Sequence, residues 1–190
     1  MMTERHAILR CPAVKSLRLT NVGPWRDLRL EFIRGINLIT GPSGTGKGTI
    51  LRALASDPSA YSSYGRERGM VDIEYCAPRW KYQVQPVTAD EFREDRGRSL
   101  GERMYAQLMK QMSIMDEDAA LLLHDGVLAV LDQPRYDTAV RMLNDIKCQI
   151  IIIVQHLRDS PAFRAPRTFH CRLENIQMGC RVEDEEGIAE

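Results

Sequence analysis

The sequence predicts an α/β fold in which a mainly parallel central sheet is flanked by helices and joined to an N-terminal antiparallel β subdomain. The first observation is a glycine-rich segment, 41–49, that lies between the apolar run 35–40 and the helix-forming run 49–54. The second is a pair of apolar segments, 127–131 and 149–154, the latter an unbroken apolar run after its first residue, Gln149. Such runs are typical of strands that are buried on both faces of a parallel sheet.

The third observation is an alternation of apolar and polar residues in 14–22 and again in 28–32. This pattern predicts two half-buried antiparallel strands, which lead into the strand at 35–40. Residues 14–40 are therefore assigned to the antiparallel subdomain, and the first dozen residues to a loose lead-in.

The segment 41–49 predicts a P-loop, the phosphate-binding turn between a buried strand and a helix. Its glycines let backbone N–H groups turn toward an anion, and Lys47 can reach the outer phosphates of ATP. The expected nucleotide-binding residues are Gly41, Pro42, Ser43, Gly44, Thr45, Gly46, Lys47, Gly48 and Thr49. Nearby Trp25 is expected to pack in a turn rather than to stack on the nucleotide base.

The magnesium site departs from the usual motif, because Gly48 occupies the place where a Ser or Thr hydroxyl normally binds Mg²⁺. Either Thr49 takes over in a shifted register, or the metal relies on Asp132, Gln85 and water. Asp132 follows the apolar run 127–131, so we expect it at the carboxyl end of a parallel strand. His156, just past the run 149–154, is expected at the same edge.

Composition fits one globular domain, 1–190, with 44% hydrophobic and 27% charged residues and a frayed tail at 183–190. The formal net charge is zero, so any contact with DNA needs a local basic patch. We expect a cytoplasmic protein that does not enter the membrane, because no apolar run approaches about 20 residues and the N-terminus lacks a signal sequence. The five scattered cysteines are expected to be reduced thiols.

The remaining elements are read from periodicity. Residues 86–117 form a helical segment in which 102–115 carries apolar residues on one side. A second helix is expected at 136–147. Hairpins are expected from two pairs of alternating runs, 70–75 with 80–85 and 168–173 with 176–182.

Together the motifs resemble an ATP-binding-cassette ATPase, and in particular the heads of SMC and RecF-type DNA-repair ATPases. Residues 17–41 are similar to the start of those heads, and Asp132-Gln133-Pro134 is similar to their second nucleotide motif, Asp-Glu-Pro. Ser99-Leu100-Gly101-Glu102-Arg103 resembles a degenerate signature motif. Gln155-His156 resembles the switch-histidine position. The resemblance spans residues 14–182.

The resemblance implies a homodimer, or a head-to-head assembly, that ATP holds together. Ser99 and Gly101 of one head would cover the γ-phosphate bound by Lys47 of another, and Asp137 would lie in a dimer-contact loop. Gln133 stands at the place of the catalytic glutamate, so the resemblance implies slow or blocked hydrolysis, because an amide cannot take the proton from water. The glutamine is either natural, as in an ATP-gated clamp, or an engineered change.

The function expected from this resemblance is an ATP-binding head that acts with an effector or DNA-acting partner, in DNA repair, mobile-element or phage-defence processes. Two alternatives stay open. One is the nucleotide-binding subunit of a transporter, against which the short region between Lys47 and Ser99 argues. The other is a small-molecule kinase, which the adenylate-kinase-like Lys47-Gly48-Thr49 favours.

Overall fold

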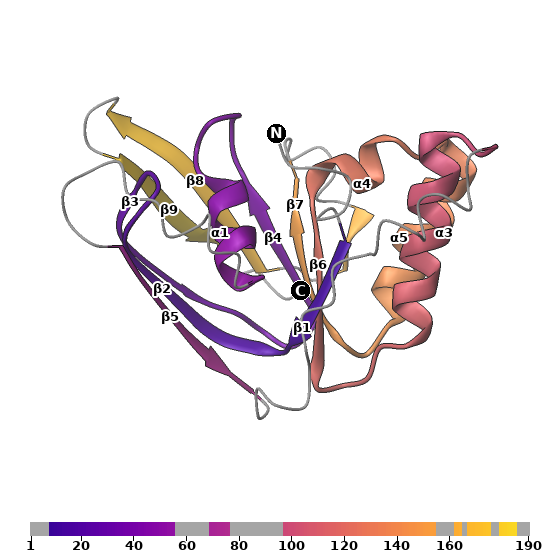
Figure 1. The fold of residues 1–190 in the computed structure, drawn as a ribbon, viewed down its shortest axis with the longest axis horizontal. Helices are drawn as coiled ribbons and strands as arrows, with labels where there is room; N and C mark the ends of the chain where they lie inside the picture. The colour runs from indigo at the N-terminus through magenta and orange to yellow at the C-terminus, as the bar shows by residue number, and fades with distance from the viewer. Residues whose placement is uncertain are drawn as a thin grey trace.

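The computed structural model describes residues 8–55, 69–76, 97–154, 162–164, 167–175 and 179–185. Their strands form two sheets, and the helices pack between the sheets and on the far side of the larger one (Figure 1). The observed architecture is the α/β arrangement that the sequence predicts, a mainly parallel sheet with an antiparallel β subdomain.

The larger sheet has six strands in a mixed arrangement. Its inner strands are parallel, and an antiparallel strand closes each edge. In spatial order the strands are β1 (Ile8–Pro12), β6 (Ala119–Leu123), β7 (Gln149–Ile153), β4 (Ile36–Thr40), β8 (Arg167–Asn175) and β9 (Gly179–Glu185). Every residue of β4, β6 and β7 is buried, as expected for strands covered on both faces.

The smaller sheet is antiparallel, with β2 (Val14–Val22) between β3 (Trp25–Glu31) and β5 (Met70–Tyr75). Its inward face carries the apolar residues predicted from the alternation, such as Leu17 and Leu19. Its outward face carries exposed ion pairs between neighbouring side chains: Lys15 with Glu74, Arg18 with Asp27, and Arg29 with Glu31. Positive charge on this face is therefore balanced locally.

The helices cover both faces of the six-stranded sheet. Helix α1 (Lys47–Leu54) packs between the two sheets, in a core that it shares with β2 and β3. Among the described residues, α3 (Leu100–Ser113), α4 (Asp125–Ala129) and α5 (Gln133–Asp145) pack on the opposite face. Figure 1 shows α1 to one side of β4 and the α3–α5 pair to the other. The P-loop helix and the signature-like helix thus belong to different layers.

Two buried side-chain amides join these parts at the amino ends of the strands. Gln149, only 2% exposed, pairs with both backbone groups of Val14 and also donates to the carbonyl of Ile33. Asn37, fully buried, bonds to the backbone of Ile33, Gly35 and Ile150. These amides hydrogen-bond to backbone groups where the two sheets meet, and Gln149 ties the antiparallel sheet to the larger one.

The predicted strand at 127–131 is wrong. The strand lies earlier, at β6, and most of 127–131 belongs to α4 and the turn after it. Both segments are short apolar runs, and periodicity cannot separate a buried strand from a short helix in that case. Burial separates them, because β6 is wholly buried whereas Val130 is 36% exposed.

Both ends of the chain hold more structure than expected. Part of the predicted lead-in is β1, which pairs with β6. Strand β9 extends to Glu185, so the frayed tail predicted from 183 is wrong for residues 183–185. The helices predicted at 49–54, 102–115 and 136–147 and the terminal hairpin lie within three residues of their predicted positions. Helix α4 was not predicted, and residues 80–96 are outside the described part of the chain. Cys11, Cys76 and Cys148 are free thiols, as expected.

Candidate functional site

The P-loop leaves the carboxyl end of β4 and enters α1 through a backbone that only glycine adopts readily. Gly41, Gly44 and Gly46 have φ values of 136°, 84° and 83°. Thr45 is buried, and its hydroxyl donates to the carbonyl of Pro42 at 2.9 Å, which closes the loop on itself. Pro42, Ser43 and Gly44 are exposed, so the crest of the loop is open to an incoming anion.

Lys47 holds its ammonium group inside this loop. The side chain is 7% exposed, and Nζ donates to the carbonyl oxygens of Gly41 at 2.6 Å and Pro42 at 2.7 Å. A buried cation needs such oxygen partners, and phosphate oxygens can take over the same role with stronger, charge-assisted bonds. The loop therefore combines a positive charge, glycines and a helix N-terminus, which together suit a phosphate group.

Trp25 supports the P-loop from the antiparallel sheet. It is 1% exposed, and its indole Nε1 donates to the carbonyl of Gly46 at 3.2 Å. A side chain at position 46 would lie 2.5 Å from Pro24, so this contact also requires glycine. The prediction that Trp25 packs is confirmed.

The two residues that follow Lys47 face different surroundings. A Cβ at Gly48 would meet nothing within 4 Å, so this position faces open space. Thr49 is 6% exposed and accepts a hydrogen bond from Arg52 at 3.2 Å, and a Cβ added at Gly23 in the β2–β3 turn would lie 3.0 Å from its side chain. The geometry therefore argues against Thr49 as the replacement for the missing magnesium-binding hydroxyl.

The acid nearest to the end of a central strand is Asp125, not Asp132. Strand β6 ends at Leu123, which is level with Ile152 of β7, and Ile152 is level with Leu38 of β4. Asp125 comes two residues after β6, at the same edge of the sheet as the P-loop, and α4 lies along that edge in Figure 1. The expectation that Asp132 follows a strand directly is corrected, because α4 intervenes.

Asp132 instead caps helix α5. Its Oδ1 accepts from the backbone N–H of Arg135 at 3.1 Å, and its other oxygen pairs with the Arg135 guanidinium. Gln133 begins the helix, and its Nε2 donates to Asp137 Oδ1 at 2.7 Å. The side chains of Asp132, Gln133 and Asp137 are exposed.

Ser99 and Gly101 lie at the start of α3, as a signature loop requires. Ser99 is the N-cap: its hydroxyl accepts from the N–H of Glu102 at 3.3 Å, and its own N–H donates to Glu102 Oε2 at 2.9 Å. Ser99 is exposed, and its hydroxyl also hydrogen-bonds to the Glu102 carboxylate, which lowers the pKa of that group. This capping box fixes the first turn of α3.

Comparison with known proteins shows which fold this chain has. A family model described as an AAA domain matches residues 16–68. The Thermotoga maritima SMC head domain matches 92% of this chain and 99% of its own length, with a TM-score of 0.58 and 12% identity. The chain has the fold of an ABC-type P-loop ATPase head. This agrees with the family resemblance inferred from the motifs.

Two curated relatives match shorter parts of this head. The DNA double-strand break repair Rad50 ATPase of Methanopyrus kandleri is 32% identical over 81 residues, which is 38% of this chain and 9% of that protein. The Septu protein PtuA of Bacillus thuringiensis is 44% identical over 41 residues, 22% of this chain and 10% of that protein. The matched segments therefore cover only about a tenth of the length of either relative.

Some predicted site residues of the head fall outside the described part of the chain. These are Gln85 and His156. Among the described residues no group of three or more His, Cys, Asp or Glu could hold a metal ion. Magnesium does not require such a cage, since it keeps several waters and binds through one or two carboxylates together with substrate phosphates. The open position at Gly48 leaves room for that mode of binding.

Sequence reasoning missed two features of the head. His124 and Asp125, directly after β6, were passed over because the later run 127–131 ends in the motif-like Asp132-Gln133. Arg135 was not singled out at all. One signal pointed to Asp125: apolar runs lie on both sides of His124, so either run could have formed the strand.

Proposed function

We propose that this chain is an ATP-binding head that associates with a second copy, or with another head, through ATP held between them. Two described regions support the proposal. The P-loop offers a cation and open space for phosphates, and the exposed start of α3 offers a hydroxyl and a helix N-terminus. The observation that carries it is their placement: α1 and α3 cover opposite faces of the sheet.

That placement suits a shared site. If Ser99 binds a γ-phosphate, that phosphate belongs to an ATP held by the P-loop of a second molecule. This is the head-to-head arrangement, with ATP between the heads, that the signature motif implies. ATP then completes an interface that is incomplete without the γ-phosphate, so nucleotide controls association.

Magnesium in this site is proposed to depend on Asp125 rather than Asp132. Asp132 is engaged twice by Arg135, through the backbone N–H and through the guanidinium. A carboxylate already neutralised by an arginine is a poor ligand for a second cation, whereas Asp125 follows the strand that runs toward the P-loop edge.

We therefore expect Asp125→Asn to weaken magnesium-dependent ATP binding about tenfold or more, the scale of losing one charge-assisted contact. Asp132→Asn should change it little, because asparagine caps a helix about as well as aspartate. ATP titrations with magnesium and with EDTA measure both. A larger loss for Asp132→Asn would restore the metal role first expected for Asp132.

Hydrolysis is proposed to be slow. The Gln133 side chain is an amide, and its N–H₂ group donates to Asp137. If residue 133 were a glutamate, its carboxylate would lie against the carboxylate of Asp137 and repel it. An amide is therefore better suited to this position. This favours a natural residue over an engineered one, and a head that holds ATP longer than it splits it.

DNA and a partner protein complete the proposal. The Rad50 relative is named for DNA double-strand break repair, and this supports DNA repair, with mobile-element and phage-defence processes as related settings. The paired charges on the outer face of β2, β3 and β5 make that face an unfavourable DNA contact. None of the described helices is long and apolar enough to span a bilayer.

The experiment is a measurement of molar mass by light scattering, with and without ATP and magnesium, for the wild type and for Ser99→Arg. The wild type should double its mass with ATP, alone or with its partner. Ser99→Arg should bind ATP and stay monomeric. An unchanged wild-type mass in the presence of the partner, or loss of ATP binding by the Ser99→Arg monomer, would refute the proposal.

A further inference from the structure

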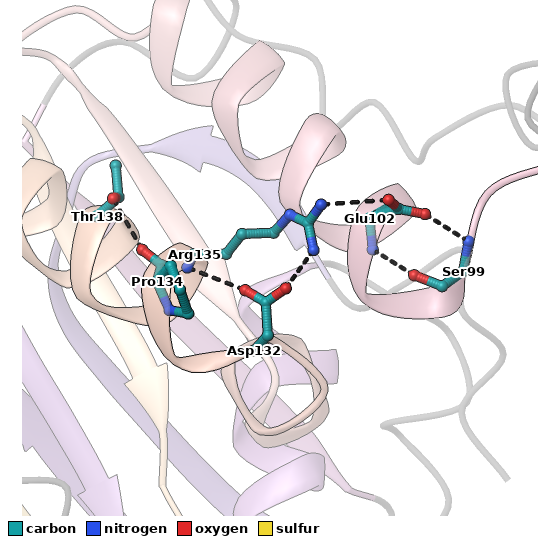
Figure 2. Close-up of polar contacts among 6 residues, drawn as sticks. All are labelled: Ser99, Glu102, Asp132, Pro134, Arg135 and Thr138. Carbon is teal, nitrogen blue, oxygen red and sulfur yellow. Dashed lines mark hydrogen bonds and ion pairs between the residues drawn. The ribbon is translucent and has the colours of Figure 1, made fainter.

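A guanidinium joins the two helix starts that the proposed function brings to the ATP interface. Arg135 Nη2 lies 3.2 Å from Glu102 Oε1 of α3, and its Nη1 pairs with Asp132 at the start of α5. Figure 2 shows these contacts as one chain from Ser99 to Asp132. The chain connects segments 33 residues apart in sequence.

A backbone contact reinforces this connection. A Cβ added at Gly101 would lie 2.4 Å from the carbonyl oxygen of Val130, so the first turn of α3 packs directly on the segment before Asp132. Contacts this close allow little independent movement. The starts of α3 and α5 therefore form one unit, held by backbone packing and by Arg135.

The charge of Arg135 matters because Glu102 lies one turn from Ser99. Hydrogen bonds from the backbone N–H and the hydroxyl of Ser99, together with nearby Arg135 and Arg98, lower the pKa of Glu102. The carboxylate is thus ionised at neutral pH, beside the hydroxyl that is proposed to meet a γ-phosphate. An uncompensated carboxylate at that position would repel the phosphate.

Arginine suits this position better than lysine. Its planar fork offers donors to two carboxylates at once, whereas an ammonium group is a point charge on a flexible stem. The bridge is also largely exposed, at 36% for Arg135, 39% for Glu102 and 51% for Asp132, and exposed ion pairs add little to folding stability. An effect on association can therefore be separated from an effect on folding.

We propose that Arg135 is a positioning residue, which locks the Ser99–Gly101 loop to the start of α5 and neutralises Glu102 so that the γ-phosphate of a second head can approach. The proposal rests on the proposed function and assigns its electrostatic control to one side chain. Arg135 acts through Glu102 and Ser99, and it does not itself need to touch ATP.

The test compares Arg135→Gln, Arg135→Lys and a matched control, Arg141→Gln, which removes an exposed arginine from the same helix. We expect Arg135→Gln to weaken ATP-dependent association about tenfold, the scale of one lost charge-assisted contact. Arg135→Lys should rescue it only in part. ATP affinity of the monomer and the melting temperature should match those of the control.

A double variant separates charge from geometry. In Arg135→Gln/Glu102→Gln the repelling carboxylate is gone, so association should recover relative to Arg135→Gln alone. A merely structural arginine would show no such recovery. Equal association of Arg135→Gln and Arg141→Gln, or no recovery in the double variant, would overturn the proposal.

Amide hydrogen exchange keeps the test independent of the proposed function. In the monomer, Arg135→Gln should speed exchange in the first turns of α3 and α5, and Arg141→Gln should not. If wild type fails to associate with ATP, the proposed function fails and the phosphate role of Arg135 fails with it. If wild type associates but exchange and association are both unchanged in Arg135→Gln, only the role of Arg135 is refuted.

Discussion

Gln149→Leu is expected to lower the free energy of unfolding by about 2–6 kcal/mol, because it removes the side-chain partner of the N–H and the carbonyl of Val14, at about 1–3 kcal/mol for each group. The Ile33 carbonyl keeps its hydrogen bond from Asn37. The amide accepts from the N–H of Val14 at 2.8 Å and donates to the carbonyls of Val14 at 2.8 Å and Ile33 at 2.9 Å. Leucine has a similar volume, so the loss reports the hydrogen bonds rather than a cavity.

Gln107→Leu is the matched control. Its side-chain nitrogen is buried without a hydrogen-bond partner among the described residues, so the same replacement should be neutral or stabilising. Urea denaturation measures both variants. Equal changes in unfolding free energy would show that Gln149 does not join the two sheets as the structure indicates.

Gly41→Ala is expected to destabilise the fold by about 3 kcal/mol and to abolish ATP binding, because strain at a positive φ adds to a backbone clash. The residue has a φ of 136°, and a Cβ there would lie 2.2 Å from the carbonyl oxygen of Cys171 on β8. Neither β8 nor the P-loop can move away without breaking the parallel pairing of β4 with β8.

Gly35→Ala separates the two causes. Gly35 also has a positive φ, 118°, but a Cβ there would meet nothing within 4 Å. It should therefore lose only the strain energy, about 1–2 kcal/mol, and keep ATP binding. Thermal unfolding and nucleotide titration of both variants provide the comparison. Loss of ATP binding in Gly35→Ala would mean that strain, not the contact with β8, decides the P-loop geometry.

The P-loop could be predicted because its chemistry is local. The strand, the glycines, Lys47 and the helix follow one another within a few residues, and each is needed where it stands. The start of α3 was predictable for the same reason, since Ser99 and Glu102 form a capping box within one turn.

The position of Asp125 at the edge of the sheet could not be predicted in this way. Two short apolar runs flank His124, and only the neighbouring strands decide which becomes β6. The same limit applies to Gln149, whose partner Val14 is 135 residues away, and to Arg135, whose partner Glu102 is 33 residues away. The local sequence gives no sign of the role of such polar side chains, because their hydrogen-bond partners are far away in the chain.

The shared ATP site is tested most directly by mixing two defective variants, Lys47→Ala and Ser99→Arg. Each variant alone should stay monomeric with ATP and magnesium, the first because it lacks the phosphate-binding cation and the second because it blocks the partner's γ-phosphate. In a mixed pair, Lys47 of one molecule faces Ser99 of the other, so one intact site remains. Light scattering should then show a doubled mass, with one ATP bound per pair. Association of Lys47→Ala alone, or no association of the mixture under conditions in which the wild type associates, would contradict a site shared between two heads.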